Sequence, residues 1–413
     1  MMHRGFPFGL FLLLTAFTSF AQQTEIKISG VVIDAQSKIS LPGASVYLDQ
    51  TTKGTTTNEK GEFVLKVPSG NYNLIVSYVG YKPLSIPMNA LSNPVLHLEL
   101  EPSGKSLDEV NITADSNWQE YFMLFRMFFF GRTGTQSTIV NPKVLSFNYS
   151  KSYVLTAQAG STLIIENQLF GYKVFYDLTF FSHVAGRTSY TGYTHFEEIV
   201  PKDMKEQERW MANRENAYYG SSAHFMRALA NRQLKEEGFL VKILEKTKTP
   251  PASHPVLKRW QGDEHKAPDT IVTMRWNGMD YSPQDTIVLT NAEKSKADKW
   301  GSKAGFNVLY PGEVPYKYIV QRSPFEGNST LSFPRSLFIT YKKKKSQTDF
   351  WGYGAGYRPS FPTSIITMLK TQTLIDNNGN LSDPNAIINE GYWAAFRVAN
   401  QLPVDFVPVK AMK

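Results

Sequence analysis

Apolar and polar residues alternate along the first quarter of the chain. Gly, Pro and Asn residues divide the alternation into short segments, whose apolar positions include Ala44, Val46, Leu48, Phe63, Leu65, Val67, Leu74, Val76, Tyr78, Leu84, Ile86, Met88, Leu96, Leu98 and Leu100. A period of two residues is typical of half-buried antiparallel strands. Six or seven such strands at short spacing predict a small β-sandwich over residues 26–101.

Several short motifs in this region resemble the carboxypeptidase-regulatory-like family, a transthyretin-like β-sandwich. The motifs are Ser29-Gly30-Val31-Val32-Ile33-Asp34, Leu41-Pro42-Gly43-Ala44, Gly54-Thr55-Thr56-Thr57-Asn58 with Gly61-Glu62-Phe63, Ser77-Tyr78-Val79-Gly80-Tyr81 and Leu107-Asp108-Glu109-Val110. Similar modules precede the plug of many TonB-dependent outer-membrane importers and begin many secreted proteins of Gram-negative bacteria. The resemblance covers about a fifth of the chain. It implies an envelope setting and a non-catalytic N-terminal module, and it gives no substrate.

The pattern becomes mixed after a turn-rich stretch at residues 102–115, which we interpret as a linker. Aromatic residues from Trp118 to Phe130 recur at helical spacing and predict a buried helix. Further strands are predicted at residues 163–165, 173–176, 178–181, 269–273, 285–289, 316–320 and 336–341, and further helices at residues 201–215, 390–400 and from Ser221 or Ser222 to Gly238. The chain is therefore predicted to be multidomain and mainly β, with an α+β domain over residues 116–413.

The first residues have the layout of a secretory signal peptide. Met1–Arg4 form a short basic head, an apolar run extends from Phe6 to Phe20, and cleavage is expected after Ala21. The apolar run is too short for a transmembrane anchor, and no later segment has ~20 uninterrupted apolar residues. We therefore expect an exported protein without a transmembrane helix after signal removal, in the periplasm, at the outer membrane or on the cell surface.

Composition narrows the choice of partners. The chain has no cysteine, which excludes disulfides and thiolate metal sites. Its formal net charge is +8, and export makes anionic lipid or polysaccharide a more suitable counter-charge than nucleic acid. An evenly solvated surface is the simpler explanation of this charge. The densest charge run, Lys342–Lys345, either meets anionic glycans or lipid head groups or protects a strand end from edge pairing. In the sandwich, Asp34, Asp49 and Glu62 lie beside turns, where carboxylates usually cap the backbone.

Two catalytic hypotheses concern the C-terminal domain. His195-Phe-Glu-Glu198 has the His-x-x-Glu spacing of a zinc peptidase, with His224, His254 or His265 as a third ligand. No family signature surrounds this pair, and in metallocarboxypeptidases the sandwich follows the catalytic domain. Tyr219-Gly-Ser-Ser-Ala-His224 places hydroxyls close to an imidazole, as in a serine hydrolase. The Gly-x-Ser-x-Gly elbow is absent, however, and helix capping explains Ser221 and Ser222.

The sequence thus favours an exported envelope protein that binds a partner protein or a glycan and needs no cofactor or metal. The alternative is a hydrolase whose active site lies in the C-terminal domain, with His195, Glu198 and His224 as catalytic candidates. A compact pocket with convergent His, Glu or Ser side chains would favour the enzyme. An exposed aromatic patch without such a cluster would favour binding.

Overall fold

The computed structural model describes most of the chain after the predicted signal peptide. The described residues are 25–90, 92–103, 117–131, 134–184, 187–247, 272–276, 286–288, 305–323, 327–345 and 360–409. The predicted linker beyond residue 103, His254 and His265 lie outside these residues. None of the helices in the described ranges is long and apolar enough to cross a membrane.

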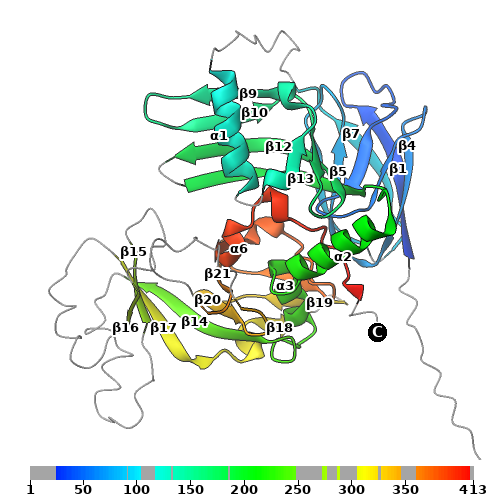
Figure 1. The fold of residues 1–413 in the computed structure, drawn as a ribbon. Helices are drawn as coiled ribbons and strands as arrows, with labels where there is room; N and C mark the ends of the chain where they lie inside the picture. Colours follow the sequence, from blue (N-terminus) through cyan, green and yellow to red (C-terminus); the bar gives the residue numbers. More distant parts are fainter. Residues whose placement is uncertain are drawn as a thin grey trace, which may run out of the picture.

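The N-terminal module, blue in Figure 1, is a sandwich of two small sheets. Its strands are β1 (Glu25–Asp34), β2 (Ser45–Leu48), β3 (Gly54–Thr56), β4 (Glu62–Pro68), β5 (Gly70–Ser77), β6 (Leu84–Ala90) and β7 (Val95–Leu100). One sheet has the order β4-β1-β7 and the other β3-β2-β5-β6. The alternating apolar side chains of both sheets, such as Ile28, Leu48 and Leu74, meet in one buried core. The predicted β-sandwich is confirmed.

A six-stranded sheet follows, with helix α1 across one face (Figure 1). Its elements are α1 (Trp118–Phe130), β8 (Ser137–Ile139), β9 (Leu145–Tyr149), β10 (Leu155–Ala159), β11 (Leu163–Asn167), β12 (Tyr172–Val184) and β13 (Arg187–Glu198). The helix is confirmed, and Phe125 and Phe129 are buried against the sheet. The prediction of two strands at residues 173–176 and 178–181 was wrong, because β12 continues through a register shift after Leu178.

The rest of the chain builds a second core between two sheets and helix α3. The elements are α2 (Met204–Tyr218), α3 (Ser222–Ala230), β14 (Phe239–Thr247), β15 (Val272–Trp276), β16 (Thr286–Val288), β17 (Gly305–Glu313), β18 (Val320–Arg322), β19 (Asn328–Leu331), β20 (Ser336–Tyr341), β21 (Thr363–Met368), β22 (Thr373–Asp376), β23 (Ile387–Gly391) and α6 (Tyr392–Ala395). The sheets have the orders β16-β15-β17-β14-β20-β21-β23 and β18-β19-β22. The region after the module is therefore α+β, and its described residues form two large cores and a small separate cluster of Leu244, Leu309 and Ile365.

One predicted helix and one predicted strand differ in the structure. Helix α3 begins as predicted, since the Ser221 hydroxyl accepts a hydrogen bond from the His224 N–H at 3.1 Å. It ends at Ala230 rather than near Gly238, because the chain turns back so that Leu234 enters the same core as Leu229. The predicted strand at residues 316–320 was also wrong, since a 3₁₀ turn at Tyr316–Tyr318 precedes β18.

The predicted helix at residues 390–400 was wrong for a structural reason. Tyr392 and Trp393 enter the core of the second α+β region, whereas Val398 and Ala399 enter the core under α1. A continuous helix cannot divide one apolar stripe between two cores in this way. The segment instead forms the four-residue α6, an extended residue at Phe396 and a 3₁₀ turn.

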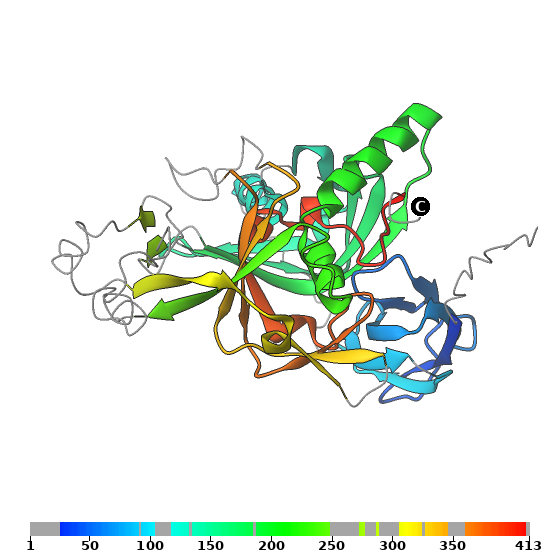
Figure 2. The ribbon, with the colours of Figure 1, turned by 90° about the horizontal axis from the view of Figure 1, so that it is seen from below.

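The module is docked through the turn that joins β2 to β3. The Gln50 N–H donates to the Thr194 carbonyl at 2.7 Å, and the Val404 N–H donates to the Gln50 carbonyl at 2.8 Å. The Phe196 N–H donates to the Thr51 carbonyl at 3.0 Å. Figures 1 and 2 both show the last residues of the chain, in red, beside the module. This turn therefore contacts β13 and the C-terminal segment at once.

Candidate functional site

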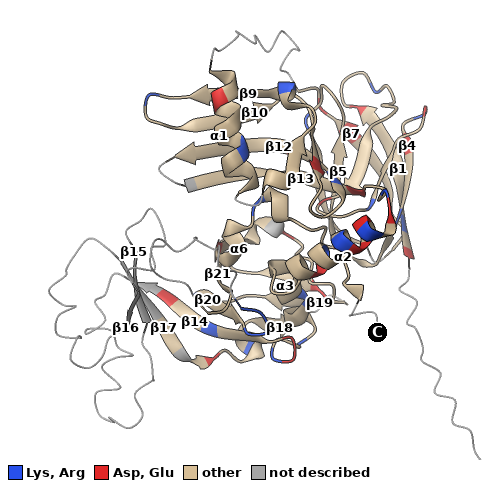
Figure 3. Ribbon diagram, viewed as in Figure 1, with Lys and Arg blue, Asp and Glu red and all other residues tan. Residues whose placement is uncertain are grey.

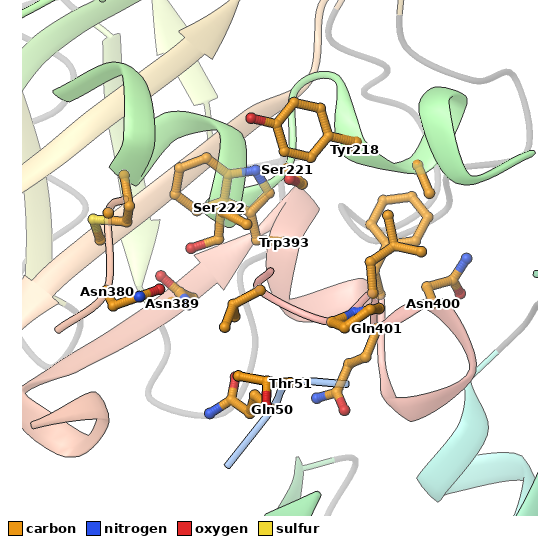
Figure 4. Close-up of a pocket in the computed structure, with 18 of the residues that line it drawn as sticks. Gln50, Thr51, Tyr218, Ser221, Ser222, Asn380, Asn389, Trp393, Asn400 and Gln401 are labelled. Atoms are coloured by element: carbon orange, nitrogen blue, oxygen red, sulfur yellow. The ribbon is translucent and has the colours of Figure 1, made fainter. Parts of the chain in front are cut away.

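A pocket of about 520 Å³ lies where the module meets the two later regions. Gln50 and Thr51 come from the module, Ser222 from α3, Asn216 from α2 and Gln401 from the C-terminal segment. Figure 4 shows Gln50 and Thr51 on one side of the pocket and Ser221 and Ser222 on the other. The volume is in the range of small-molecule sites, roughly 300–1,000 Å³.

Carboxamide side chains dominate the polar lining. Ten of the 31 lining residues are Asn or Gln, whereas only Asp49 and Lys344 carry a formal charge. A carboxamide offers two N–H donors and one carbonyl acceptor, so it can satisfy a ligand group that both donates and accepts. The partly exposed rings of Tyr72, Tyr219 and Phe396 add apolar surface.

Helix α2 is fixed over the pocket by its contacts with the loop between β11 and β12. The Trp210 indole N–H donates to the Gln168 carbonyl at 2.9 Å, and the Asn213 amide donates to the Leu169 carbonyl at 2.9 Å. Gly171 has a φ of 67°, and a Cβ there would lie 2.2 Å from the Trp210 ring. This close packing places the last turn of α2, which carries Asn216, at the pocket wall.

Arg227 of α3 joins three segments around the pocket without a carboxylate partner among the described residues. Its guanidinium donates to the Tyr218 hydroxyl at 2.7 Å, to the Val404 carbonyl at 3.0 Å and to the Phe406 carbonyl at 3.2 Å. Arginine suits this task because its five N–H donors have a fixed planar arrangement. The C-terminal wall of the pocket is thus fastened to α3.

Asp376 connects the module to the turn after β22. It is 4% exposed and accepts hydrogen bonds from the backbone N–H groups of Asn71, Asn378 and Asn380 at 2.8–2.9 Å. Burial raises the pKa of this carboxyl, and the N–H donors offset part of the rise. Through Asp376 the start of β5, which carries Asn71, and the turn that carries Asn378 and Asn380 form one continuous wall.

Asp49 lies at the same interface and behaves differently from the other sandwich carboxylates. Its carboxylate accepts from the Thr194 N–H at 2.8 Å, across the interface with β13. Burial raises its pKa to about 6, against the lowering effect of that hydrogen bond. Asp34, by contrast, caps its own turn by accepting from the Ser37 N–H at 2.6 Å, as predicted. The sequence did not predict that docking of the module against β13 would leave Asp49 half-buried.

Asn389 has an unused polar atom at the pocket. Its Oδ1 is buried and has no hydrogen-bond partner among the described residues. Figure 4 places its side chain next to Asn380, on the side of the pocket where Ser222 lies. Buried polar atoms in folded proteins are nearly always paired. The unpaired acceptor therefore marks a position where a donor from a bound molecule or water would complete the hydrogen bonding.

The His195 and Glu198 side chains do not act together in the structure. Both lie on β13, where residues three positions apart point to opposite faces. The His195 ring packs between Tyr47 and Phe175, with centroid distances of 5.4 and 6.1 Å. Glu198 instead pairs with Arg214 of α2 at 3.1 Å. The sequence spacing that resembled a zinc pair is thus divided between two faces of a sheet.

His224 is occupied by structural hydrogen bonds. Its Nδ1 accepts from the Gly220 N–H at 3.1 Å, so Nε2 carries the proton and donates to Glu237 at 3.0 Å. Burial lowers the pKa of this imidazole despite the neighbouring carboxylate. Neither ring nitrogen is free to accept a proton from Ser221 or Ser222. Within the described ranges, no three His, Asp or Glu side chains are grouped to hold a metal ion.

Residues 28–112 match the family model of the CarboxypepD_reg-like domain. The N-terminal module is a CarboxypepD_reg-like domain. Part of this chain is similar to TonB-dependent receptor P39 of Formosa agariphila, with 31% identity over 106 residues that cover 26% of this chain and 10% of the receptor. It is also similar to TonB-dependent receptor SusC of Bacteroides thetaiotaomicron, with 37% identity over 102 residues that cover 25% of this chain and 9% of the receptor. The chain thus spans about a tenth of these relatives.

Solved structures give only low similarity. A DUF3823 family protein from Bacteroides ovatus aligns with a TM-score of 0.16 and 11% identity, over 43% of this chain and 83% of that protein. The C-terminal domain of a shaft pilin from Lactobacillus rhamnosus aligns with a TM-score of 0.17 and 18% identity, over 19% of this chain and 99% of that domain. Scores this low establish neither a shared fold for the chain nor a function.

The residues of the pocket were not identified from the sequence. Gln50, Asn216 and Gln401 are far apart along the chain, and each sits in an ordinary polar context. One sequence signal could have indicated the pocket. The turn from Asp376 to Asn380 contains three Asn residues, more than a tight turn requires, and two of them line the pocket. The other signal was the Lys342–Lys345 run, one member of which lines the pocket.

Proposed function

We propose that the protein is an exported binding protein of the Gram-negative envelope and that its pocket holds a hydroxyl-rich ligand, a short oligosaccharide. The single observation that carries the proposal is the carboxamide-rich lining. Each sugar hydroxyl both donates and accepts, which matches the donor and acceptor pair of an Asn or Gln side chain. The partly exposed rings of Tyr72, Tyr219 and Phe396 supply flat apolar surface for the C–H faces of a sugar.

The form of the site favours a glycan over a folded partner protein. Stable protein interfaces bury about 800 Å² on each partner over a broad surface, whereas this site is a concave pocket between three parts of one chain. The envelope location rests on the similarity of the module to TonB-dependent receptors and on the predicted signal peptide. N-terminal sequencing of exported protein should find a start near Gln22, and an intact Met1 would contradict export by this signal.

Binding can be tested with the chain from residue 22 to 413 on an array of envelope and plant oligosaccharides. Array ligands should then be titrated by isothermal calorimetry against wild type and the double variant Asn216→Ala with Gln401→Ala. Neither side chain has a hydrogen bond within the described protein, so the fold should persist while two ligand contacts are lost. At about 0.5–1.5 kcal/mol for each of the two lost hydrogen bonds, affinity should fall roughly 5- to 150-fold.

Gln207→Ala is a matched control, because Gln207 is an exposed residue of α2 outside the pocket. It should bind as wild type does. If no oligosaccharide binds, or if the double variant binds as tightly as the control, the proposed function is wrong.

A further inference from the structure

Lys344 is the cationic residue in the pocket lining. It follows β20 within the run Lys342–Lys345, and it alone of the four lines the pocket. Lys343 and Lys345 are exposed, and the Lys342 ammonium lies 4.6 Å from the centroid of the Phe361 ring. The lysine run therefore follows the end of β20, and one of its four side chains, that of Lys344, lies at the pocket.

The Lys344 ammonium has a protein partner that does not neutralise its charge. It donates to the Asn216 carbonyl at 2.7 Å, at the last turn of α2. An ammonium has three N–H donors, and no carboxylate forms an ion pair with Lys344 within the described part of the chain. Burial lowers the pKa of this amine, and no neighbouring acid opposes the effect. A partly buried cation without an anion is costly unless something else supplies the anion.

The basic residues of the neighbouring wall serve other partners. Arg209 pairs with Glu206 of the same helix at 3.0 Å, and Arg214 pairs with Glu198 of β13 at 3.1 Å. Both arginine charges of α2 are therefore balanced by nearby carboxylates. Figure 3 shows basic and acidic residues interspersed along α2. Asp49, the other charged residue of the lining, lies on the module. An anionic ligand group would thus be attracted towards Lys344 and repelled from the module wall.

We propose that the oligosaccharide held by this pocket contains an acidic sugar, whose carboxylate or sulfate is bound by the Lys344 ammonium. The proposal rests on the proposed function, and it adds the chemical class of the ligand and its direction. The acidic unit contacts Lys344 beside the end of α2, and the uncharged units contact the carboxamides nearer the module. A charge-assisted hydrogen bond in a partly buried site is stronger than an exposed ion pair.

The test compares acidic oligosaccharides with matched neutral ones. The probes are a uronic-acid tetrasaccharide series and the carboxyl-reduced form of each member, titrated by calorimetry against residues 22–413. Wild type should prefer the acidic member at least tenfold, which corresponds to about 1.4 kcal/mol. Lys344→Met should abolish the preference, so that the acidic and neutral members bind with affinities within about twofold of each other. Lys345→Met, an exposed neighbour outside the pocket, should keep the preference.

The outcomes separate this proposal from the one on which it rests. Equal binding of acidic and neutral probes, or a preference that survives Lys344→Met, overturns the role of Lys344 and leaves the oligosaccharide site standing. Binding to neither series overturns both proposals. If Lys344→Met lowers thermal stability without changing the preference, Lys344 only caps α2, and the inference is wrong.

Discussion

Replacing Asp49 by Asn is expected to stabilise the docked module at neutral pH. Docking against β13 raises the pKa of Asp49 to about 6. Above that pH the folded protein must hold a poorly solvated carboxylate at the interface. An Asn side chain keeps an acceptor for the Thr194 N–H, which the wild-type carboxylate accepts at 2.8 Å, and it carries no charge to desolvate.

The magnitude follows from the shift in pKa. A change from 3.8 to about 6 is about 2 units, or an upper bound of about 3 kcal/mol in the free energy of unfolding. Because the pKa is raised in the folded state, the folded protein binds the proton more tightly than the unfolded chain does. The stability from Asp49 is therefore fully present below pH 3.8 and is lost as the pH rises through about 6.

Urea unfolding, followed by tryptophan fluorescence at about pH 4 and about pH 7.5, tests this linkage. Asp49→Asn should be more stable than wild type by up to about 3 kcal/mol at the higher pH, and the difference should shrink at the lower pH. Asp34→Asn is a control of opposite sign, since hydrogen bonds led by the Ser37 N–H lower the pKa of Asp34 to about 2. In wild type the ionised Asp34 carboxylate stabilises the fold at neutral pH, and this stabilisation is lost as the pH falls towards about 2. A pH-independent difference between Asp49→Asn and wild type would refute the reasoning.

Three further predictions concern the architecture. Asp376→Ala leaves the N–H groups of Asn71, Asn378 and Asn380 unpaired and should cost at least about 3 kcal/mol in urea unfolding. Glu101→Ala, which breaks a solvent-exposed pair with Lys82, should cost under about 1 kcal/mol. Equal losses would count against the role of Asp376 at the interface. Ser221→Ala removes the cap of α3 and should cost about 1 kcal/mol by thermal unfolding, and the uncapping account fails if Ser222→Ala costs as much. A fragment of residues 24–103 should fold alone, because its core is closed within the module; a disordered amide NMR spectrum would contradict the predicted boundary.

Local periodicity was enough to predict the module and several later elements. The alternation that places Leu65 and Leu74 in the sandwich core is visible in a few consecutive residues. Helix α1 and the Ser221 cap were predictable for the same reason, since a helical stripe or a capping hydroxyl is a short-range signal. These features need no knowledge of the distant chain.

The errors occurred where distant contacts decide the structure. Residues 390–400 have a helical apolar pattern, yet Trp393 and Val398 belong to different cores. The burial of Asp49 depends on β13, about 145 positions later. The pocket could not be predicted for the same reason, because Gln50, Asn216 and Gln401 meet only after three regions have packed together.

A crystal structure of residues 22–413 with an oligosaccharide from the array tests the central claim most directly. We expect ligand density between the Gln50–Thr51 turn, the last turn of α2 and the segment that carries Gln401. Carboxamides should contact the sugar hydroxyls, and Asn389 Oδ1 should accept a hydrogen bond from the ligand or from a bridging water. Sugar bound elsewhere on the molecule, with this pocket holding only solvent, would contradict the account.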